Sequence, residues 1–261
     1  MNPLTNQFFH HRITTQVNDR LVIIPTYNEK ENIENLIRKV FQLTPSFHIL
    51  IVDDNSPDGT GNIVKNLKNE FKETLFLLER PGKQGLGTAY ISGFKWALEH
   101  GYEFIFEMDA DFSHDPNDLV RLNDACQNGA DLSIGSRYKS GVNVVNWPMG
   151  RVLISYFASA YVRFITGMNI RDTTAGFKCY RRMVLETINL DKIRFKGYAF
   201  QIEMKFLTWK YGFNIVEIPI IFTDRKMGTS KMSGKIVYEA VWGVIKMKIS
   251  SWFKTYERSP Y

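Results

Sequence analysis

The sequence predicts an α/β fold with a mostly parallel central sheet and helices on both of its faces. Three observations predict it. Short apolar runs alternate with amphipathic segments between residues 20 and 138, polar turn residues separate them, and a composition of 44% hydrophobic and 23% charged residues is that of an ordinary folded protein. A chain of 261 residues is long enough to bury a large core.

The predicted elements alternate along the chain. The first strand is the apolar run 21–24, which Pro25 ends before a loop. Residues 29–43 form the first helix, because apolar residues recur at helical spacing and acids occupy the first turn. The same reasoning places strands over 47–54, 74–80, 102–111 and 130–138, and helices over 55–71, 85–101 and 115–129.

Each predicted strand ends in polar residues, at 25–29, 53–54, 79–80, 109–111 and 136–138. The carboxyl ends of parallel strands meet at one edge of a sheet, and ligands bind at that edge in such folds. The sequence therefore predicts a ligand site there.

Asp109 and Asp111 flank Ala110 directly after the apolar run "FIFEM". At an extended strand end both carboxylates point to the same side, where they repel each other unless a divalent cation lies beside them. Such ligands suit Mg²⁺ or Mn²⁺, which keep coordination positions open for substrate phosphates. The D-x-D spacing alone is weak evidence, but a second acid pair at another strand end strengthens it. Asp115 precedes Pro116 like an N-cap before a proline at the first helical position, so we leave it out of the site.

Charge and cysteine content indicate the surroundings of the protein. Residues 1–120 contain 11 Lys and Arg against 17 Asp and Glu, a net charge of −6, so the rest of a chain of net charge +6 carries +12. This predicts an acidic half that holds a cation and a basic half that meets phosphates, on a substrate or an anionic membrane, and a chance imbalance of solvated side chains is the alternative. Cys126 and Cys179 form no disulfide framework, and residues 1–16 contain no apolar secretory segment. We expect a cytoplasmic protein with a poorly ordered lead-in over residues 1–20.

The segments 147–167 and 234–259 are rich in aromatic, apolar and basic residues, but neither has an uninterrupted apolar run near the roughly 18 residues of a membrane span. On a helical projection of the C-terminal segment, polar and apolar residues fall on opposite sides. The polar arc holds Lys235, Glu239, Gly243, Lys246, Ser250 and Lys254, and the apolar arc holds Val237, Val241, Ile245, Ile249 and Trp252, with Lys248 interrupting it. Such a helix packs on the core or on a partner protein, or it lies in a membrane interface.

Seven motifs occur in order along the chain: "IIPTYNEKENI", "IVDDNSPDGT", "GKQGLGTAY", "MDADFSHDP", "IGSRY", "RDTTAGFKCYRR" and "DRKMGTSKMS". Together they resemble the dolichol- or polyprenyl-phosphate mannosyltransferases of the inverting GT-A glycosyltransferases, family 2. The resemblance implies a GT-A, Rossmann-like nucleotide-sugar-binding fold over residues 21–233, followed by a C-terminal amphipathic helix over 234–261.

The resemblance also implies roles for individual residues. Those expected to line the nucleotide pocket or hold the base are Pro25, Tyr27, Glu29, Val52, Asp54 and Lys83. Asp109, Ala110 and Asp111 correspond to the metal and diphosphate motif, with Asp111 the more direct ligand and Asp109 facing the ribose or a metal-bound water. Ser113 stands where some relatives have a glutamine ligand, so it binds the metal directly or through a water.

Several residues match phosphate-binding positions of the family. They are Ser136, Arg137 and Arg151 for the acceptor phosphate, and Arg225 and Lys231 for the nucleotide sugar. A diphosphate leaving group and a phosphate acceptor repel each other unless cations lie between them. Stabilisation of the leaving group is then the main catalytic effect, so Asp109, Asp111 and Arg137 are the expected catalytic residues.

The expected acceptor removes the need for a catalytic base. A hydroxyl acceptor loses a proton as it attacks, whereas a phosphate monoester is already ionised at neutral pH and needs positioning instead. We therefore nominate no base and assign no role to His114.

The resemblance implies transfer of mannose from GDP-mannose to dolichyl or polyprenyl phosphate, with Mg²⁺ or Mn²⁺ as cofactor and no nucleic-acid partner. The enzyme is expected to associate peripherally with the membrane surface through its own helices or a membrane-anchoring subunit. One alternative in the same fold uses UDP-glucose or another nucleotide sugar, with a lipid-phosphate or hydroxyl acceptor. Another is a non-catalytic nucleotide-sugar-binding subunit at the membrane, which would be expected to lack the metal acids that are present here. Polyprenol length and saturation, the physiological metal and the oligomeric state stay open.

Overall fold

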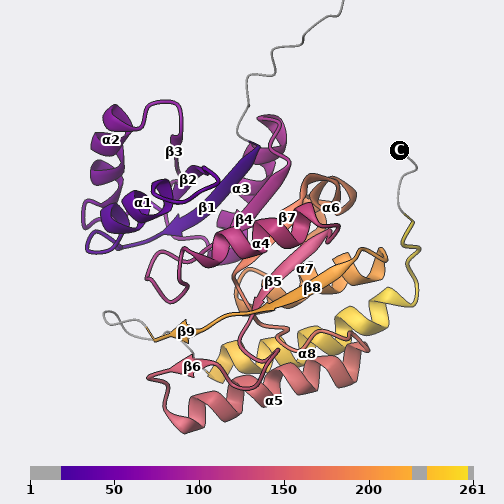
Figure 1. Cartoon of the computed structure of the whole chain (residues 1–261). Helices are drawn as coiled ribbons and strands as arrows, with labels where there is room; N and C mark the ends of the chain where they lie inside the picture. The colour runs from indigo at the N-terminus through magenta and orange to yellow at the C-terminus, as the bar shows by residue number, and fades with distance from the viewer. Residues whose placement is uncertain (1–18, 225–233, 258–261) are drawn as a thin grey trace, which may run out of the picture.

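A mostly parallel sheet forms the centre of the computed structural model, which describes residues 19–224 and 234–257 (Figure 1). The sheet has seven strands in the order β3-β2-β1-β4-β7-β5-β8. These are β1 (Arg20–Thr26), β2 (His48–Asp53), β3 (Leu75–Glu79), β4 (Phe104–Glu107), β5 (Leu132–Ser136), β7 (Lys178–Arg181) and β8 (Ile215–Pro219). β7 runs antiparallel between β4 and β5, and the other neighbouring pairs are parallel, so the predicted sheet is confirmed. A short parallel pair, β6 (Val144–Val145) and β9 (Phe222–Thr223), lies outside it.

Two helical layers cover the sheet. One contains α1 (Ile33–Phe41), α2 (Thr60–Glu70) and α4 (Asp118–Gln127), and the other contains α3 (Leu86–Glu99), α6 (Arg182–Thr187) and α7 (Tyr198–Lys210), with a 3₁₀ turn at Leu190–Lys192. Successive side chains of a strand point to opposite faces. Leu21 and Ile23 of β1 accordingly pack in the core beneath α3 and α7, while Val22 and Ile24 pack beneath α1 and α4.

The order of the strands creates the place for a site. The chain lays β1, β2 and β3 outward in one direction and then returns to add β4 on the other side of β1. Ligands bind at such a switch point in open α/β sheets, outside the carboxyl ends of the strands. The loop after β1 and the acids after β4 therefore flank the predicted position.

The expected start of α4 is wrong by two residues. Its first residue is Asp118 and its N-cap residue is Asn117, so Asp115 is not the N-cap and Pro116 is not the first helical residue. Instead, an Asp115 carboxylate oxygen accepts hydrogen bonds from the backbone and side-chain nitrogens of Asn117, at 3.0 and 2.8 Å. This short-range turn competes with the helix and delays its start.

Helices α5 (Met149–Thr166) and α8 (Gly234–Ser251) lie side by side, at the end of the molecule opposite α1 and α2 (Figure 1). Lys248 Nζ donates to the carbonyl of Thr166, 2.9 Å away, at the last residue of α5. A cation at that position meets carbonyls that have no partner within their own helix. No helix among the described residues is long and apolar enough to cross a membrane.

The two sides expected of the C-terminal helix are partly wrong. Gly243, placed on the polar arc, is buried, and a Cβ there would lie 2.6 Å from the ring of Phe195. Val244 and Met247 complete the buried side. Val241 and Ile249, placed on the apolar arc, are exposed. The helix therefore packs on the core through one side and also presents apolar side chains to the outside.

Candidate active site

The ends of β1 and β2, with the loops after β1, β2 and β3, bring together the residues expected to bind the nucleotide. Pro25 and Val52 are register partners in adjacent strands, and Lys83 Nζ lies 4.7 Å from the centre of the Tyr27 ring. The backbone nitrogen of Glu29 donates to Thr60 Oγ1 at 3.0 Å, which ties this loop to α2.

Asp54 lies at the same edge but is already paired within the protein. Its buried carboxylate accepts a 2.6 Å hydrogen bond from Arg80 Nε, and Arg80 Nη1 donates to Thr88 Oγ1 at 2.9 Å. Arg80 therefore joins the end of β2 to the first turn of α3. The spacing of Arg80 and Asp54 along the chain gave no sign of this pairing.

The acids after β4 face one cavity of about 690 Å³, which Asp109, Asp111 and Ser113 all line. Ala110 between them is buried in the core, and both acids line the cavity, although they follow the end of β4 at Glu107 and do not belong to an extended strand. The backbone nitrogen of Ser113 donates to Asp111 Oδ1 at 3.0 Å. Phe112 has a left-handed backbone, with φ of 57°, which turns the chain sharply between Asp111 and Ser113.

These residues fit a divalent cation as a partial ligand set. Two carboxylates and one hydroxyl share the cavity, while no three His, Cys, Asp or Glu side chains gather as a metal-binding group in the described part of the chain. Mg²⁺ and Mn²⁺ suit this arrangement, because they bind through one or two carboxylates and complete their shell with water and substrate phosphates. A site with a full set of protein ligands would leave no room for a diphosphate.

Tyr90 supports Asp109 from α3. Its hydroxyl lies 3.5 Å from Asp109 Oδ1. Burial, together with the nearby Asp109 carboxylate, raises the pKa of Tyr90 well above its ordinary value, so the phenol keeps its proton and stays a donor.

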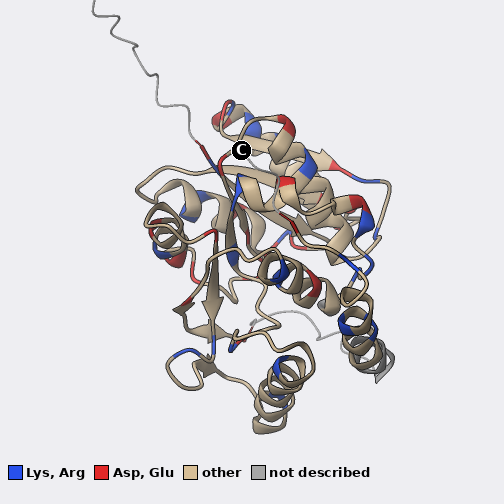
Figure 2. Cartoon of the chain, turned by 90° about the vertical axis from the view of Figure 1, so that its right-hand side faces the viewer, with Lys and Arg blue, Asp and Glu red and all other residues tan. Residues whose placement is uncertain are grey.

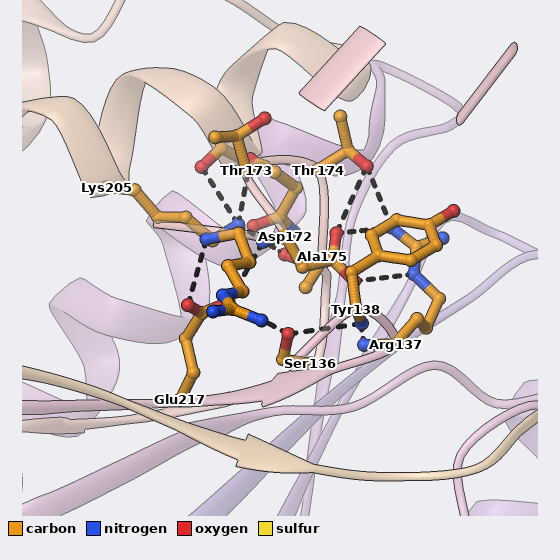
Figure 3. A network of polar contacts seen from close by, with 11 residues as sticks. Ser136, Arg137, Tyr138, Asp172, Thr173, Thr174, Ala175, Lys205 and Glu217 are labelled. Atoms are coloured by element: carbon orange, nitrogen blue, oxygen red, sulfur yellow. Dashed lines mark hydrogen bonds and ion pairs between the residues drawn. The ribbon is translucent and has the colours of Figure 1, made fainter. Parts of the chain in front are cut away.

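Arg137 lines the same cavity and is held by a bidentate ion pair (Figure 3). Its Nε and Nη2 atoms donate to the two oxygens of Asp172 at 2.7 and 2.6 Å, and Nη2 also donates to Thr174 Oγ1 at 2.8 Å. Burial opposes the charge of Asp172, but the Arg137 guanidinium outweighs it and lowers the pKa of this carboxyl below its ordinary value. Asp172 lies within the motif "RDTTAGFKCYRR", yet nothing in the spacing indicated its partner 35 residues away.

The other expected acceptor-phosphate residues are placed differently. Arg151 lines the cavity, where it stacks 4.1 Å from the centre of the Trp147 ring and bonds Asp224 at 2.8 Å. Ser136 is fully buried and donates to Glu217 Oε1 at 2.8 Å, and it is not among the residues that line the cavity. Arg225 and Lys231 lie outside the described residues.

The cavity continues from the charged groups into an apolar groove between α5 and α8. The groove residues are Ile154, Phe157, Ala158, Tyr161, Val241 and Val244. Tyr161 also ties the two helices together, since its hydroxyl donates to the carbonyl of Val241 at 3.0 Å. The site therefore joins a cluster of acids and cations to an apolar surface that opens at exposed side chains such as Phe157.

His114 lines the cavity without an evident proton-transfer role. Its ring is buried and stacks on Phe177, with 4.7 Å between ring centroids. Burial lowers the pKa of His114 to about 4, although the Asp111 carboxylate opposes this shift, so the imidazole is neutral at physiological pH.

Comparison with known proteins agrees with this geometry. Residues 21–188 match the family model described as "Glycosyl transferase family 2". The chain is 48% identical over 232 residues to a polyprenol monophosphomannose synthase of Mycolicibacterium smegmatis, covering 89% of this chain and 86% of that one. It is 47% identical over 231 residues to an undecaprenyl-phosphate mannosyltransferase of Micrococcus luteus, covering 88% of this chain and 94% of the relative.

Solved structures share the fold. A glucosyl-3-phosphoglycerate synthase from Mycobacterium tuberculosis, in complex with Mn²⁺, UDP and glucosyl-3-phosphoglycerate, superposes with a TM-score of 0.63 at 15% identity, covering 90% of this chain and 80% of that one. The same enzyme in complex with Mg²⁺ and UDP superposes with a TM-score of 0.62 at 17% identity, covering 90% and 79%. At this level of identity the likeness shows a GT-A architecture and no more.

Proposed function

Because the chain is a glycosyltransferase that belongs to glycosyl transferase family 2, we propose that it transfers mannose from GDP-mannose to a polyprenyl phosphate such as dolichyl phosphate. The observation that carries this proposal is the single cavity in which Asp109, Asp111, Arg137 and Arg151 meet the apolar groove between α5 and α8. A nucleotide sugar and a phosphate acceptor need the charged part. An acceptor with a long hydrocarbon chain needs the apolar part.

The charged residues divide between the two substrates. Asp109, Asp111 and Ser113 would hold Mg²⁺ or Mn²⁺ next to the donor diphosphate, and the cation, when bound, would neutralise charge on the leaving group. Arg137 and Arg151 line the same cavity, and their guanidinium groups suit an incoming phosphate. We assign the nucleotide to the loops that carry Tyr27, Asp54 and Lys83, together with the neighbouring Pro25, Glu29 and Val52.

The reaction then needs positioning more than proton transfer. An oxygen of the ionised acceptor phosphate forms a bond to the anomeric carbon, while the bond between that carbon and the diphosphate oxygen breaks and GDP leaves with the electron pair. Attack opposite the leaving group inverts the configuration. No proton is removed from the acceptor, which agrees with the buried and neutral imidazole of His114 at the cavity wall.

The surface around the groove fits a membrane. Exposed apolar side chains occur on α5, with Phe157 at 62% and Phe164 at 86% exposure, and directly after α8 ends at Ser251, with Trp252 at 68% and Phe253 at 84%. In Figure 2 this end of the molecule, formed by α5 and α8, is mostly uncharged with scattered basic residues. Aromatic and apolar side chains beside Lys and Arg are typical of a helix in the membrane interface. We propose peripheral attachment that brings the groove to the lipid acceptor.

A transfer assay tests the proposal. Labelled GDP-mannose, GDP-glucose and UDP-glucose are each offered with a polyprenyl phosphate of short or long chain, with Mn²⁺ or Mg²⁺ or with a chelator. We expect mannose transfer that needs the cation and improves with chain length, since each added apolar group in the groove contributes to binding. No transfer from any donor would overturn the proposal, and transfer from UDP-glucose alone would replace the donor.

A matched pair of variants tests the metal acids in the same assay. Asp111→Ala should abolish transfer while the protein unfolds at the wild-type temperature. Asp115→Asn serves as the control, because this acid lies four positions further along and an asparagine oxygen can keep the turn with Asn117. Substantial transfer by Asp111→Ala would show that the metal binds elsewhere.

A further inference from the structure

The segment 171–176, which leads from α5 towards β7, is held from two sides by buried or half-buried charges. On one side, the Glu217 carboxylate of β8 accepts hydrogen bonds from the backbone nitrogens of Arg171 and Asp172, at 2.8 and 2.9 Å. On the other side, Lys205 Nζ of α7 donates to the carbonyl oxygens of Thr173 and Ala175, at 3.1 and 2.6 Å. Peptide groups outside regular structure need such partners when they are buried.

Lys205 is an unusual residue for the inside of a helix layer. It is fully buried, and its amine also lies 3.4 Å from the carbonyl of Gln201, so three oxygens surround it. Three acceptors match the three N–H groups of an ammonium ion, whereas a neutral amine has only two. Burial lowers the pKa of Lys205 well below its ordinary value, the nearby Lys178 charge adds to that shift, and the Asp172 charge opposes it. Burying an apolar side chain there would cost less desolvation free energy than burying a charge. The buried lysine therefore indicates a role beyond packing.

A series of hydrogen bonds connects Lys205 to the candidate active site (Figure 3). Asp172 is fully buried, and its oxygens accept from the Nε, Nη2 and backbone nitrogen of Arg137. Thr174, in the same segment, accepts from Arg137 as well. The direction of the Arg137 guanidinium in the cavity is therefore set by the segment, and the segment is set by Lys205 and Glu217.

We propose that Lys205 is a positioning residue for acceptor recognition: its ammonium group fixes the carbonyls of Thr173 and Ala175, which hold Asp172 and thereby aim Arg137 at the acceptor phosphate. This inference rests on the proposed function, in which Arg137 meets that phosphate. Lys205 touches neither substrate. It acts through backbone groups, and Glu217 supports the same segment from the opposite side.

The test is a pair of buried α7 variants in the transfer assay. Lys205→Met keeps the length of the side chain and removes the charge. Thr208→Val, one turn away, is the control, since Thr208 is equally buried and its hydroxyl donates to the Met204 carbonyl of its own helix. Loss of one charge-assisted contact to the phosphate should raise the KM for polyprenyl phosphate by about tenfold in Lys205→Met. The KM for the donor should stay at the wild-type value, and Thr208→Val should match the wild type in both.

A second variant covers the case in which Lys205→Met does not fold. Glu217→Gln removes the charge on the other side of the segment, from a strand at the sheet edge. It should raise the same acceptor KM and spare the donor KM. If Lys205→Met does fold, the double variant Lys205→Met with Asp172→Asn should have the same acceptor KM as Asp172→Asn alone. The effects of two residues that act on Arg137 through the same contacts are not additive.

The outcomes separate the two proposals. If the wild-type protein transfers no sugar to polyprenyl phosphate, the proposed function fails and the acceptor role of Lys205 fails with it. If the wild type transfers sugar but Lys205→Met behaves like Thr208→Val, only the positioning role is overturned. Equal increases in the donor and acceptor KM values would also overturn it, since they indicate a general loss of structure. If Lys205→Met does not fold, an unchanged acceptor KM in Glu217→Gln would overturn the positioning role.

Discussion

The ion pair between Arg137 and Asp172 allows stability and catalysis to be separated. Arg137→Met leaves the Asp172 carboxylate, which is fully buried, without its guanidinium partner. Asp172→Asn leaves the Arg137 cation, with a side chain only 10% exposed, without its carboxylate. In both single variants one buried charge loses its ion-pair partner. The double variant Arg137→Met with Asp172→Asn removes both charges, and the asparagine oxygen can still accept from the backbone nitrogen of residue 137.

The size of the effect follows from the burial of the pair. Removing one partner of a buried ion pair costs about 3–5 kcal/mol, whereas replacing both by neutral groups is often nearly neutral. For a chain of this size each kcal/mol lowers Tm by about 2–4 °C, so the single variants should unfold about 6–20 °C below the wild type. The double variant should recover most of that loss.

Thermal unfolding and acceptor kinetics on the same preparations test this reasoning. All three variants should have a much higher KM for polyprenyl phosphate, because each lacks either the Arg137 guanidinium or the Asp172 carboxylate that orients it. The double variant is the informative one, since it is stable and still defective. A wild-type Tm in Arg137→Met would show that the pair contributes nothing to stability. A double variant with wild-type acceptor KM would refute the role of Arg137.

Three further predictions concern other parts of the molecule. Gly243→Ala places a Cβ 2.6 Å from the Phe195 ring, so it should push α8 from the core and cost about 1–3 kcal/mol in urea unfolding, and a wild-type midpoint would contradict this packing. Burial lowers the pKa of His48, so the unfolded chain binds more protons below pH of about 6.5 and stability should fall as the pH drops through that value. His48→Gln should flatten part of that fall in pH-dependent unfolding, since buried His114 contributes to it as well, and an unchanged slope would exclude His48 as a source. Replacing Trp252 and Phe253, both largely exposed, by Ser should weaken sedimentation with anionic vesicles while leaving transfer to a short-chain acceptor in solution unchanged, and unaltered sedimentation would point to a separate anchoring subunit.

Much of the fold was predictable because its signals are local. The alternation of apolar runs and amphipathic segments reports strands and helices over a few residues each, and the elements from β1 to β5 occur in the predicted order, although their ends differ, as at the start of α4. The sequence also predicted that Asp109 and Asp111 would face one side, and both line the cavity while Ala110 packs in the core, although β4 ends at Glu107 before the three residues. The turn at Asp115 shows the limit of local rules. The same residue could cap a helix that starts at Pro116 or form a turn with Asn117, and the structure contains the turn.

The sequence by itself therefore determined the α/β class, the edge of the sheet that carries the polar loops, and the acids that could hold a cation. Only the tertiary structure decided which charges are paired, because pairing depends on contacts between distant segments. Arg137 meets Asp172 across 35 positions and Arg151 meets Asp224 across 73. Periodicity also cannot show that Lys205 is buried, since a lysine within an amphipathic helix normally faces water. The apolar groove exists only once α5 and α8 pack side by side, because each helix supplies just one of its walls.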